Sequence, residues 1–323
     1  MNTREKIYNY ILKKKQVTAN KIVDNFGLSR WAIYKHLNKL LKENRISKTG
    51  KPPKVFYLIT KKERKKDDYS IRKEIKDFID NRFLDITPSG IRIKGWEGFI
   101  NLCKKRNLNI VKSAEDFVKI TKKYDSIRID GFLDGMKKMK STFSKVYLDK
   151  IFYLDFYSIE RFGKTKLGKE LLYAKQSQDK KLIKELAKDI KNPIDFLVGK
   201  YKIDAVAFIP PTVKREIQFM KELEKSLKLD LHKIKISKIK TPIIIPQKTL
   251  NKLEDRIENA KSTFVVEEDN RYDNILLIDD ALGSGATLNE IAYQIRDKRI
   301  VKNRIMGLSI TGSLKGFDVI SEV

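Results

Sequence analysis

The chain is poor in the residues that build disulfides and metal centres. It has one cysteine, Cys103, so it cannot form an intramolecular disulfide, and a lone cysteine fits a reducing compartment. Its two histidines, His36 and His232, lie far apart in the sequence, which argues against a His/Cys metal site. The first residues lack the apolar core of a signal peptide, and no segment approaches the length needed to span a bilayer. We therefore expect a cytoplasmic protein with no membrane partner.

Acidic residues are scarce relative to basic ones. The 323 residues include 70 Lys and Arg but only 42 Asp and Glu, which gives a formal net charge of +28. Residues 1–66 alone hold 19 basic and four acidic residues, a net charge of +15. Because the excess is concentrated in one small part of the chain, it indicates a polyanionic partner, most often nucleic acid.

Helical spacing dominates the first 43 residues. Apolar residues within 3–14 fall on one face of a predicted first helix. Thr18 and Ser29 are placed to cap a second and a third helix, and Gly27 is placed to end the second one. Two helices joined by a short turn that contains glycine are typical of a helix-turn-helix.

A β-hairpin is predicted directly after these helices. Two short segments, 45–48 and 55–58, flank the turn-forming residues 49–53. With the preceding helices, this order resembles winged helix-turn-helix domains over roughly residues 3–62. The resemblance implies a DNA-binding domain at residues 1–64.

The expected DNA contacts lie on the third helix and on the hairpin. They are Arg30, Trp31, Tyr34, Lys35, Asn38, Lys48, Lys51 and Lys54. Arg and Asn can pair with guanine and adenine edges, while the lysines would meet phosphates. The partner would be double-stranded DNA or another nucleic acid. The alternative is a winged helix that contacts protein.

The middle segment, residues 65–150, is predicted to be mainly helical and carries no chemical motif. Trp96 and Cys103 are expected in its core. The sequence leaves three roles open for this segment. It could be a spacer, a lid, or a dimerisation element that would make a homodimer.

From residue 151 to residue 323, short apolar runs alternate with amphipathic helices. The clearest predicted strands cover residues 204–210, 275–278 and 305–310. Strands separated by helices predict an α/β fold with a parallel sheet, whose ligands bind at the carboxyl ends of the strands.

One stretch of this region combines a predicted strand, a loop and a helix. The strand ends in Asp279 and Asp280, and a loop of small residues with Gly283 and Gly285 follows. Such a turn at the start of a helix is an anion site, because backbone N–H groups and the helix dipole point toward the ligand. A P-loop is excluded because no Lys follows the glycines, and a dinucleotide fingerprint is excluded because Leu288 stands where a third Gly is needed.

This stretch resembles the loop that binds 5-phosphoribosyl-1-pyrophosphate (PRPP) in type I phosphoribosyltransferases, although Gly283 replaces a Thr of the family pattern. The resemblance implies that Asp279 and Asp280 are catalytic and hold the ribose hydroxyls. It also implies a Mg²⁺ ion near them, held mainly by PRPP itself. The residues implied to bind the 5′-phosphate are Gly283, Ser284, Gly285, Ala286 and Thr287. The alternative is an ordinary strand-to-helix connection with a solvated acidic pair.

Two further segments extend the resemblance. Pro210 and Pro211 precede Lys214 and Arg215, which are implied to bind pyrophosphate because paired cations suit that leaving group. A second pattern is similar to the ComF family, and its residues here are Thr241, Gln247, Leu250, Arg256, Asn259 and Phe264. We therefore expect a ComF-like phosphoribosyltransferase domain at residues 151–323.

Joined to a DNA-binding domain, such a domain allows three functions. The chain could be a PRPP- or nucleotide-responsive regulator, as in purine-operon repressors, or a Mg²⁺-dependent phosphoribosyltransferase. The third is a transferase directed to nucleic acid as an effector or toxin, for example in a defence system.

Overall fold

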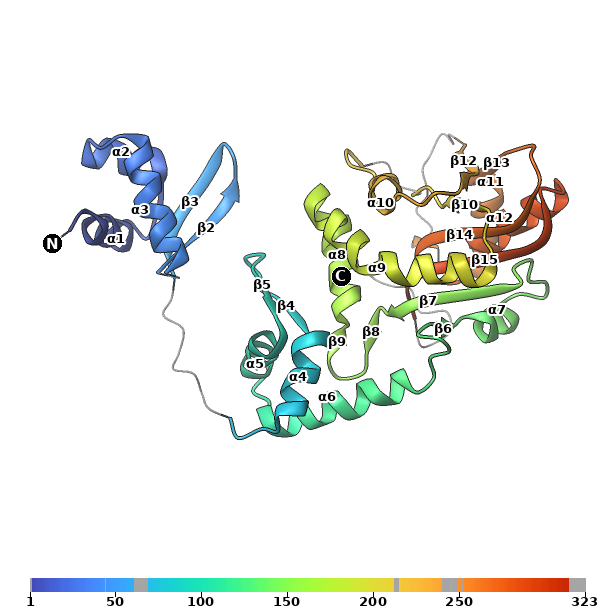
Figure 1. Ribbon diagram of the computed structural model, residues 1–323, viewed down its shortest axis with the longest axis horizontal. Coiled ribbons are helices and arrows are strands. Elements are labelled where there is room, and N and C mark those ends of the chain that lie inside the picture. Colours follow the sequence, from blue (N-terminus) through green and yellow to red (C-terminus); the bar gives the residue numbers. More distant parts are fainter. Residues whose placement is uncertain are drawn as a thin grey trace. The chain divides into compact units, whose positions relative to one another are not determined.

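The computed structural model describes residues 2–43, 45–60, 69–211, 215–239, 245, 249–250 and 252–313 (Figure 1). The chain forms two compact units. The first unit comprises residues 1–70 with 88–91, and the second comprises residues 71–87 with 92–323. No helix of the described residues is both long and apolar enough to cross a membrane.

The first unit consists of three helices and a small antiparallel sheet. Its elements are α1 (Thr3–Lys14), β1 (Gln16–Thr18), α2 (Ala19–Phe26), α3 (Arg30–Lys42), β2 (Ile46–Lys51) and β3 (Lys54–Ile59). The sheet order is β1-β3-β2, with both pairs antiparallel. The three expected helices and the expected hairpin are confirmed as elements.

Local capping explains where the helices of this unit begin and end. The Thr18 hydroxyl accepts a hydrogen bond from the Lys21 amide at 3.4 Å, and the Ser29 hydroxyl accepts one from the Ala32 amide at 3.3 Å. Gly27 has a φ of +63° and ends α2 in the left-handed conformation.

The second unit contains nine helices and twelve strands in its described part. Its first elements are α4 (Lys73–Arg82), β4 (Leu84–Ile86), β5 (Arg92–Lys94), α5 (Gly95–Lys105), α6 (Ile110–Asp125), β6 (Leu133–Asp134), α7 (Met136–Thr142), β7 (Lys150–Phe156), β8 (Ser158–Ile159), β9 (Gly163–Lys164), α8 (Lys166–Ser177) and α9 (Lys180–Tyr201). The remaining elements are β10 (Ala205–Phe208), α10 (Phe219–Leu227), β11 (His232–Lys233), β12 (Lys235–Lys238), α11 (Leu253–Thr263), β13 (Phe264–Glu267), β14 (Tyr272–Leu282), α12 (Ala286–Asp297) and β15 (Val301–Gly312).

A six-stranded sheet forms the centre of this unit, in the order β11-β10-β14-β15-β7-β6. The first five strands are parallel, and the edge strand β6 is antiparallel to β7. The expected mixed α/β fold with a parallel sheet is therefore confirmed. Strand β7 was not among the strands predicted from the sequence.

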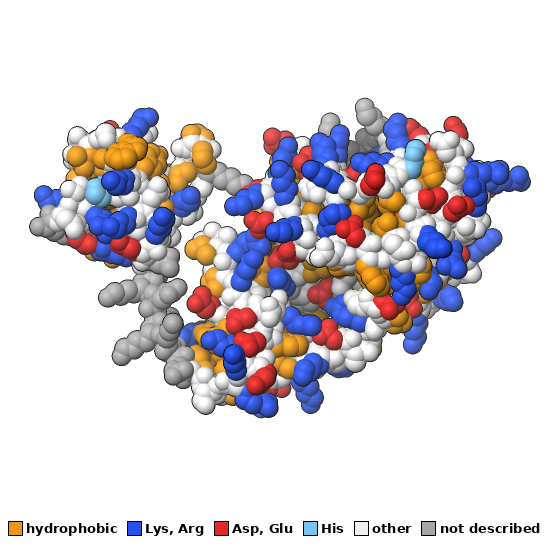
Figure 2. All heavy atoms as spheres, in the orientation of Figure 1, with side chains coloured by type: hydrophobic (Ala, Val, Ile, Leu, Met, Phe, Trp, Pro, Cys, Tyr) orange, Lys and Arg blue, Asp and Glu red, His pale blue; other side chains and the backbone are white. Residues whose placement is uncertain are grey.

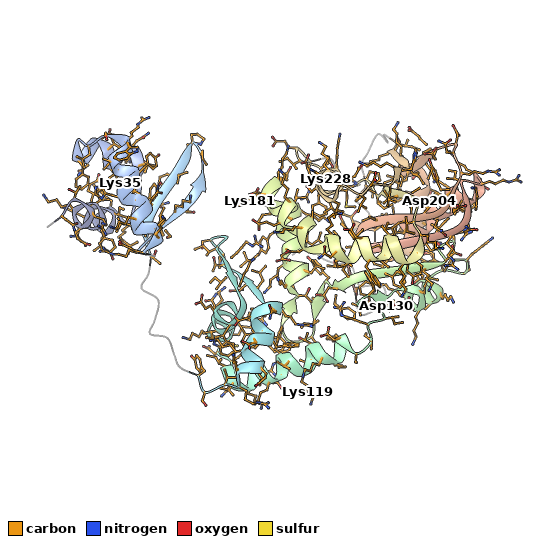
Figure 3. All side chains as sticks on the ribbon, viewed as in Figure 1. Lys35, Lys119, Asp130, Lys181, Asp204 and Lys228 are labelled. Carbon is orange, nitrogen blue, oxygen red and sulfur yellow. The ribbon has the colours of Figure 1, made fainter. Side chains whose placement is uncertain are left out.

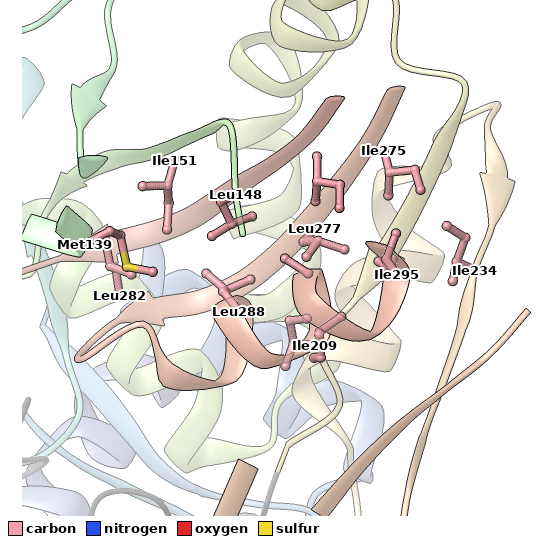
Figure 4. Close-up of a cluster of buried hydrophobic side chains, with 14 of the residues drawn as sticks. Met139, Leu148, Ile151, Ile209, Ile234, Ile275, Leu277, Leu282, Leu288 and Ile295 are labelled. Carbon is pink, nitrogen blue, oxygen red and sulfur yellow. The ribbon is translucent and has the colours of Figure 1, made fainter. Parts of the chain in front are cut away.

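Both faces of the sheet are buried. On β14, Ile275 and Leu277 face one core together with α12, while Leu276 and Ile278 face the other together with α8, α9 and α10. Figure 4 shows the first of these cores, in which Leu288 of α12 lies near Leu277. Burial on both faces explains why the strand is a continuous apolar run in the sequence.

The middle segment belongs to the same compact unit as the sheet, from residue 71 onward except for the turn 88–91. Trp96 and Cys103 are buried in it, as expected. Helix α10 begins at Phe219, after the segment that contains Arg215.

Candidate functional site

The paired carboxylates lie at the carboxyl end of the central strand. Strand β14 continues to Leu282, so Asp279 and Asp280 belong to the strand itself, and Asp279 is in register with Ser309 of β15. On the other side, the Ile209 amide donates to the Ile278 carbonyl at 2.9 Å, so the chain leaves β10 beside the carboxylates.

The two carboxylates have different surroundings because successive side chains of a strand point to opposite faces. Asp280 pairs with Lys175 of α8, whose Nζ lies 2.8 Å from Oδ2. Asp279 Oδ1 accepts a hydrogen bond from the Asp280 amide at 2.7 Å. Lys175 was not predicted as a site residue, and no local pattern around it in the sequence would have revealed it.

The protonation of Asp279 is strongly biased by this environment. Burial, together with the negative charge of Asp280, raises the pKa of Asp279 to about 8. The hydrogen bond from the Asp280 amide and the charge of Lys175 act in the opposite direction. Asp279 is thus poised to change charge when a cation or a hydrogen-bond donor binds beside it.

The small residues after the carboxylates form a tight turn into α12. Gly285 has a φ of +84°, and a Cβ at this position would lie 2.3 Å from Sδ of Met139, so only glycine fits. The buried Ser284 hydroxyl accepts a hydrogen bond from the Ala286 amide at 3.3 Å. The turn, Gly285 and the amino terminus of α12 thus have the arrangement that suits an anion.

Arg256 of α11 lies next to this turn. A Cβ built on Gly283 would be 3.8 Å from Nη1 of Arg256, and Nε of the same side chain donates to the Leu250 carbonyl at 2.7 Å. Burial lowers the pKa of Arg256. The ComF-like pattern singled out this arginine without a role, and the structure brings its guanidinium next to the turn before α12.

Of the two residues expected to bind pyrophosphate, the structure describes only Arg215. Lys214 lies outside the described residues. Arg215 Nη1 donates to the backbone carbonyl of Lys175 at 2.5 Å, and the Ile217 amide donates to Gln178 Oε1 at 3.1 Å. The segment after β10 is thereby attached to the end of α8, and Arg215 is linked through Lys175 to Asp280.

Asp279 and Asp280 offer oxygen ligands that suit a Mg²⁺ ion whose other ligands come from a substrate and from water. Within the described ranges, no group of three or more His, Cys, Asp or Glu side chains could hold a metal ion. Magnesium prefers oxygen ligands, keeps several waters and commonly takes the rest of its ligands from substrate phosphates. Asp279 and Asp280 fit that role.

The expected nucleic-acid residues lie on exposed faces of the first unit. All five candidates on α3 are exposed, and Trp31 exposes 73% of its surface. Lys35, labelled in Figure 3, places Nζ 5.1 Å from the Trp31 ring centroid. Lys48 and Lys54 are exposed on β2 and β3, whereas the Lys51 side chain lies outside the description. In Figure 2, Lys and Arg side chains are spread over the visible face of both units.

Two solved structures are similar to part of the chain. A hypoxanthine-guanine phosphoribosyltransferase from Bacillus anthracis aligns at 15% identity over 40% of this chain and 65% of its own, with a TM-score of 0.25. A hypoxanthine phosphoribosyltransferase from Staphylococcus aureus aligns at 15% identity over 38% of this chain and 61% of its own, with a TM-score of 0.21. The chain thus spans less than two thirds of either protein, and the similarity is too weak to carry a functional conclusion. No family model and no curated protein matches the chain.

Proposed function

We propose that the second unit binds PRPP with Mg²⁺ at the carboxyl end of β14, and that the first unit binds DNA. The second unit would act as a ComF-like type I phosphoribosyltransferase that displaces pyrophosphate from C1 of PRPP with a nitrogen nucleophile. The observation that carries the proposal is the pair Asp279 and Asp280 near the end of β14, which is followed by a glycine turn into α12.

In this proposal the parts of the ligand match the parts of the site. The turn 283–287 and the amino terminus of α12 take the 5′-phosphate. Asp279 and Asp280 accept hydrogen bonds from the ribose hydroxyls, and Arg215 with Lys214 holds the pyrophosphate. Bound Mg²⁺ would neutralise charge on the phosphates and the leaving group.

Catalysis would come chiefly from positioning and electrostatics, because ribosyl transfer passes through a cation-like ribose. The carboxylates stabilise positive charge that develops on the ribose. The cations of Arg215 and Lys175 stabilise the pyrophosphate as it leaves.

A winged helix-turn-helix is the proposal for the first unit. It is supported by the capped helices α2 and α3, by the β2–β3 hairpin, and by the exposed basic and aromatic residues of α3. The net charge of +15 over residues 1–66 fits a nucleic-acid partner.

Thermal unfolding with PRPP and Mg²⁺ tests the ligand site. PRPP should raise the melting temperature, since a ligand that binds only the folded state stabilises it. The double variant Asp279→Asn with Asp280→Asn should lose the rise. If the double variant is stabilised as much as the unaltered protein, PRPP does not bind at this pair.

Pyrophosphate release from PRPP, measured across bases and nucleotides with and without DNA, separates turnover from sensing. Release supports a transferase, and release only with nucleic acid present supports a nucleic-acid-directed effector. PRPP-dependent DNA affinity without release would make the chain a regulator. Removal of residues 1–62 should abolish salt-sensitive binding to duplex DNA.

A further inference from the structure

Trp31 is the most exposed large apolar side chain among the described residues, with 73% of its surface open to solvent. It is the second residue of α3, whose amino terminus is capped by the Ser29 hydroxyl. Tyr34, one turn further along the helix, is 44% exposed. Tryptophan and tyrosine are enriched where proteins contact a partner, so this aromatic pair indicates a surface that a partner covers.

The rest of the exposed face of α3 is basic. The helix contains no Asp or Glu. Its Lys and Arg residues, all of which are exposed, are Arg30, Lys35, Lys39 and Lys42. A partner that fits this face must therefore offer negative charge together with at least one apolar group. Duplex DNA offers both, in its phosphates and in the edges of its bases.

The exposed positions form a stripe that runs along the whole of α3. They are residues 30, 31, 34, 35, 38, 39 and 42. The opposite side of the helix packs into the core of the first unit. A helix that is open along one side fits the major groove of a duplex, which admits an α-helix. Single strands are instead bound in grooves where successive bases stack on aromatic side chains.

The place of Trp31 on the helix determines which part of the DNA it reaches. In a helix-turn-helix, the residues near the amino terminus of the recognition helix contact base edges in the major groove. The apolar group that a base pair presents there is the C5 methyl of thymine, and apolar side chains contact it. Trp31, in the first turn of α3, is therefore placed to meet a thymine methyl group.

Lys35 limits how the indole ring of Trp31 can be used. Its Nζ lies over the ring, 5.1 Å from the centroid, and Lys35 is labelled on α3 in Figure 3. The ring quadrupole attracts a cation in this position. A ring inserted between two base pairs needs both faces for the bases, but here an ammonium group covers one face. The remaining face and the ring edge suit a contact with a single apolar group, such as a methyl.

We propose that Trp31 recognises the C5 methyl group of thymine in the major groove of duplex DNA and is a specificity-determining residue of the first unit. The inference rests on the proposed function, in which the first unit binds DNA. The contact removes one methyl group and one face of the indole from water. Burial of a group of this size corresponds to about a fourfold change in affinity.

Fluorescence anisotropy of the full chain with two labelled duplexes tests the contact. The probes are alternating A·T duplexes made with thymine or with uracil, which differ only in the C5 methyl group. The unaltered protein should bind the thymine duplex about fourfold more tightly, or by a larger factor if several methyl groups are contacted. Both affinities should fall as salt is raised, but their ratio should stay constant, because the methyl contact involves no phosphate charge.

Replacement of Trp31 assigns the preference to this residue. Trp31→Ala should bind the two duplexes with affinities that agree within about twofold, because the apolar contact is lost. Leu12→Ala is the matched control. Leu12 is a 54% exposed apolar residue of α1 in the same unit, so this variant should keep the preference for thymine. Both side chains are exposed, so both variants should melt as the unaltered protein does.

The outcomes separate this inference from the proposed function. Duplex binding with equal affinity for thymine and uracil would overturn the inference alone and leave DNA binding in place. A preference for thymine that Trp31→Ala retains would also overturn it. Tighter binding to oligothymidine than to either duplex would overturn it by placing the aromatic pair against unpaired bases. A chain that binds none of these probes at low salt would contradict DNA binding by the first unit, and this inference with it.

Discussion

Lys175 Nζ lies 2.8 Å from Asp280 Oδ2, and both side chains are about one-fifth exposed. This ion pair joins helix α8 to the end of β14, and the Lys175 carbonyl also accepts the hydrogen bond from Arg215. One lysine therefore links the carboxylates to the segment expected to bind pyrophosphate. Because its charge lowers the pKa of Asp279, it opposes the rise in that pKa that burial and Asp280 cause.

Replacement of this lysine tests its part in ligand binding. Lys175→Met should weaken PRPP binding in the presence of Mg²⁺ about tenfold or more, because a charge-assisted interaction is lost and Asp280 is left without its cation. Titration calorimetry measures the change. Lys188→Met, at an exposed lysine of α9, is the matched control and should bind as the unaltered protein does. Equal affinity in the two variants would remove Lys175 from the site.

The raised pKa of Asp279 predicts a pH-dependent gain in stability for Asp279→Asn. The carboxyl group is protonated in the folded protein up to a pKa of about 8 but ionises near its ordinary value when unfolded, at about pH 4. The favourable contribution of Asp279 is therefore complete below about pH 4 and is lost as the pH rises to about 8. Asparagine does not titrate, so the stability of the variant should increase relative to that of the unaltered protein as the pH rises from about 4 to about 8.

Denaturant unfolding at pH 5, 6.5, 8 and 9 measures that gain. The free energy of unfolding of Asp279→Asn, minus that of the unaltered protein, should grow by more than about 1 kcal/mol between pH 5 and pH 8 and then level off. Asp77→Asn, at an exposed aspartate of α4, is the matched control for the loss of one carboxyl group. A difference that stays constant with pH would show that Asp279 is ionised in the folded protein throughout.

Local chemistry explains which features the sequence could predict. The strand, turn and helix around Asp279 followed from an apolar run, two glycines and an amphipathic segment, all within 25 residues. The helices of the first unit followed likewise from Thr18, Gly27 and Ser29, because caps act on their own neighbours.

Features that depend on distant packing were not predictable in this way. Lys175 reaches Asp280 only because α8 lies along the carboxyl edge of the sheet, and the two residues are separated by more than 100 positions. Strand β7 was missed, although it lies beside β15 in the sheet. A cavity of about 250 Å³ in the second unit is lined by Phe117, Asp155 and Glu170, and no single segment of the sequence carries that combination.

The turn before α12 should tolerate only glycine at position 285. Gly285→Ala combines a positive φ with a Cβ 2.3 Å from Met139 Sδ, so it should destabilise the fold by about 2 kcal/mol or more and abolish stabilisation by PRPP. Gly199→Ala is the matched control. Gly199 lies within helix α9 and has open space around its Cβ position, so alanine there should be neutral or stabilising. Melting curves of both variants check this, and equal behaviour would contradict the packing described for the turn.

Nucleic-acid binding should depend on the exposed face of α3. Lys35 is expected to meet a phosphate, so Lys35→Ala should weaken binding similarly for all duplex sequences and reduce the slope of log affinity against log salt by about 1. Lys76→Ala, at an exposed lysine of α4 in the other unit, removes the same charge elsewhere and should leave the slope unchanged. Fluorescence anisotropy with labelled duplex DNA at several salt concentrations measures both. A slope that falls equally in the two variants would mean that DNA responds to the net charge of the chain, and α3 would lose its assignment as the DNA-binding face.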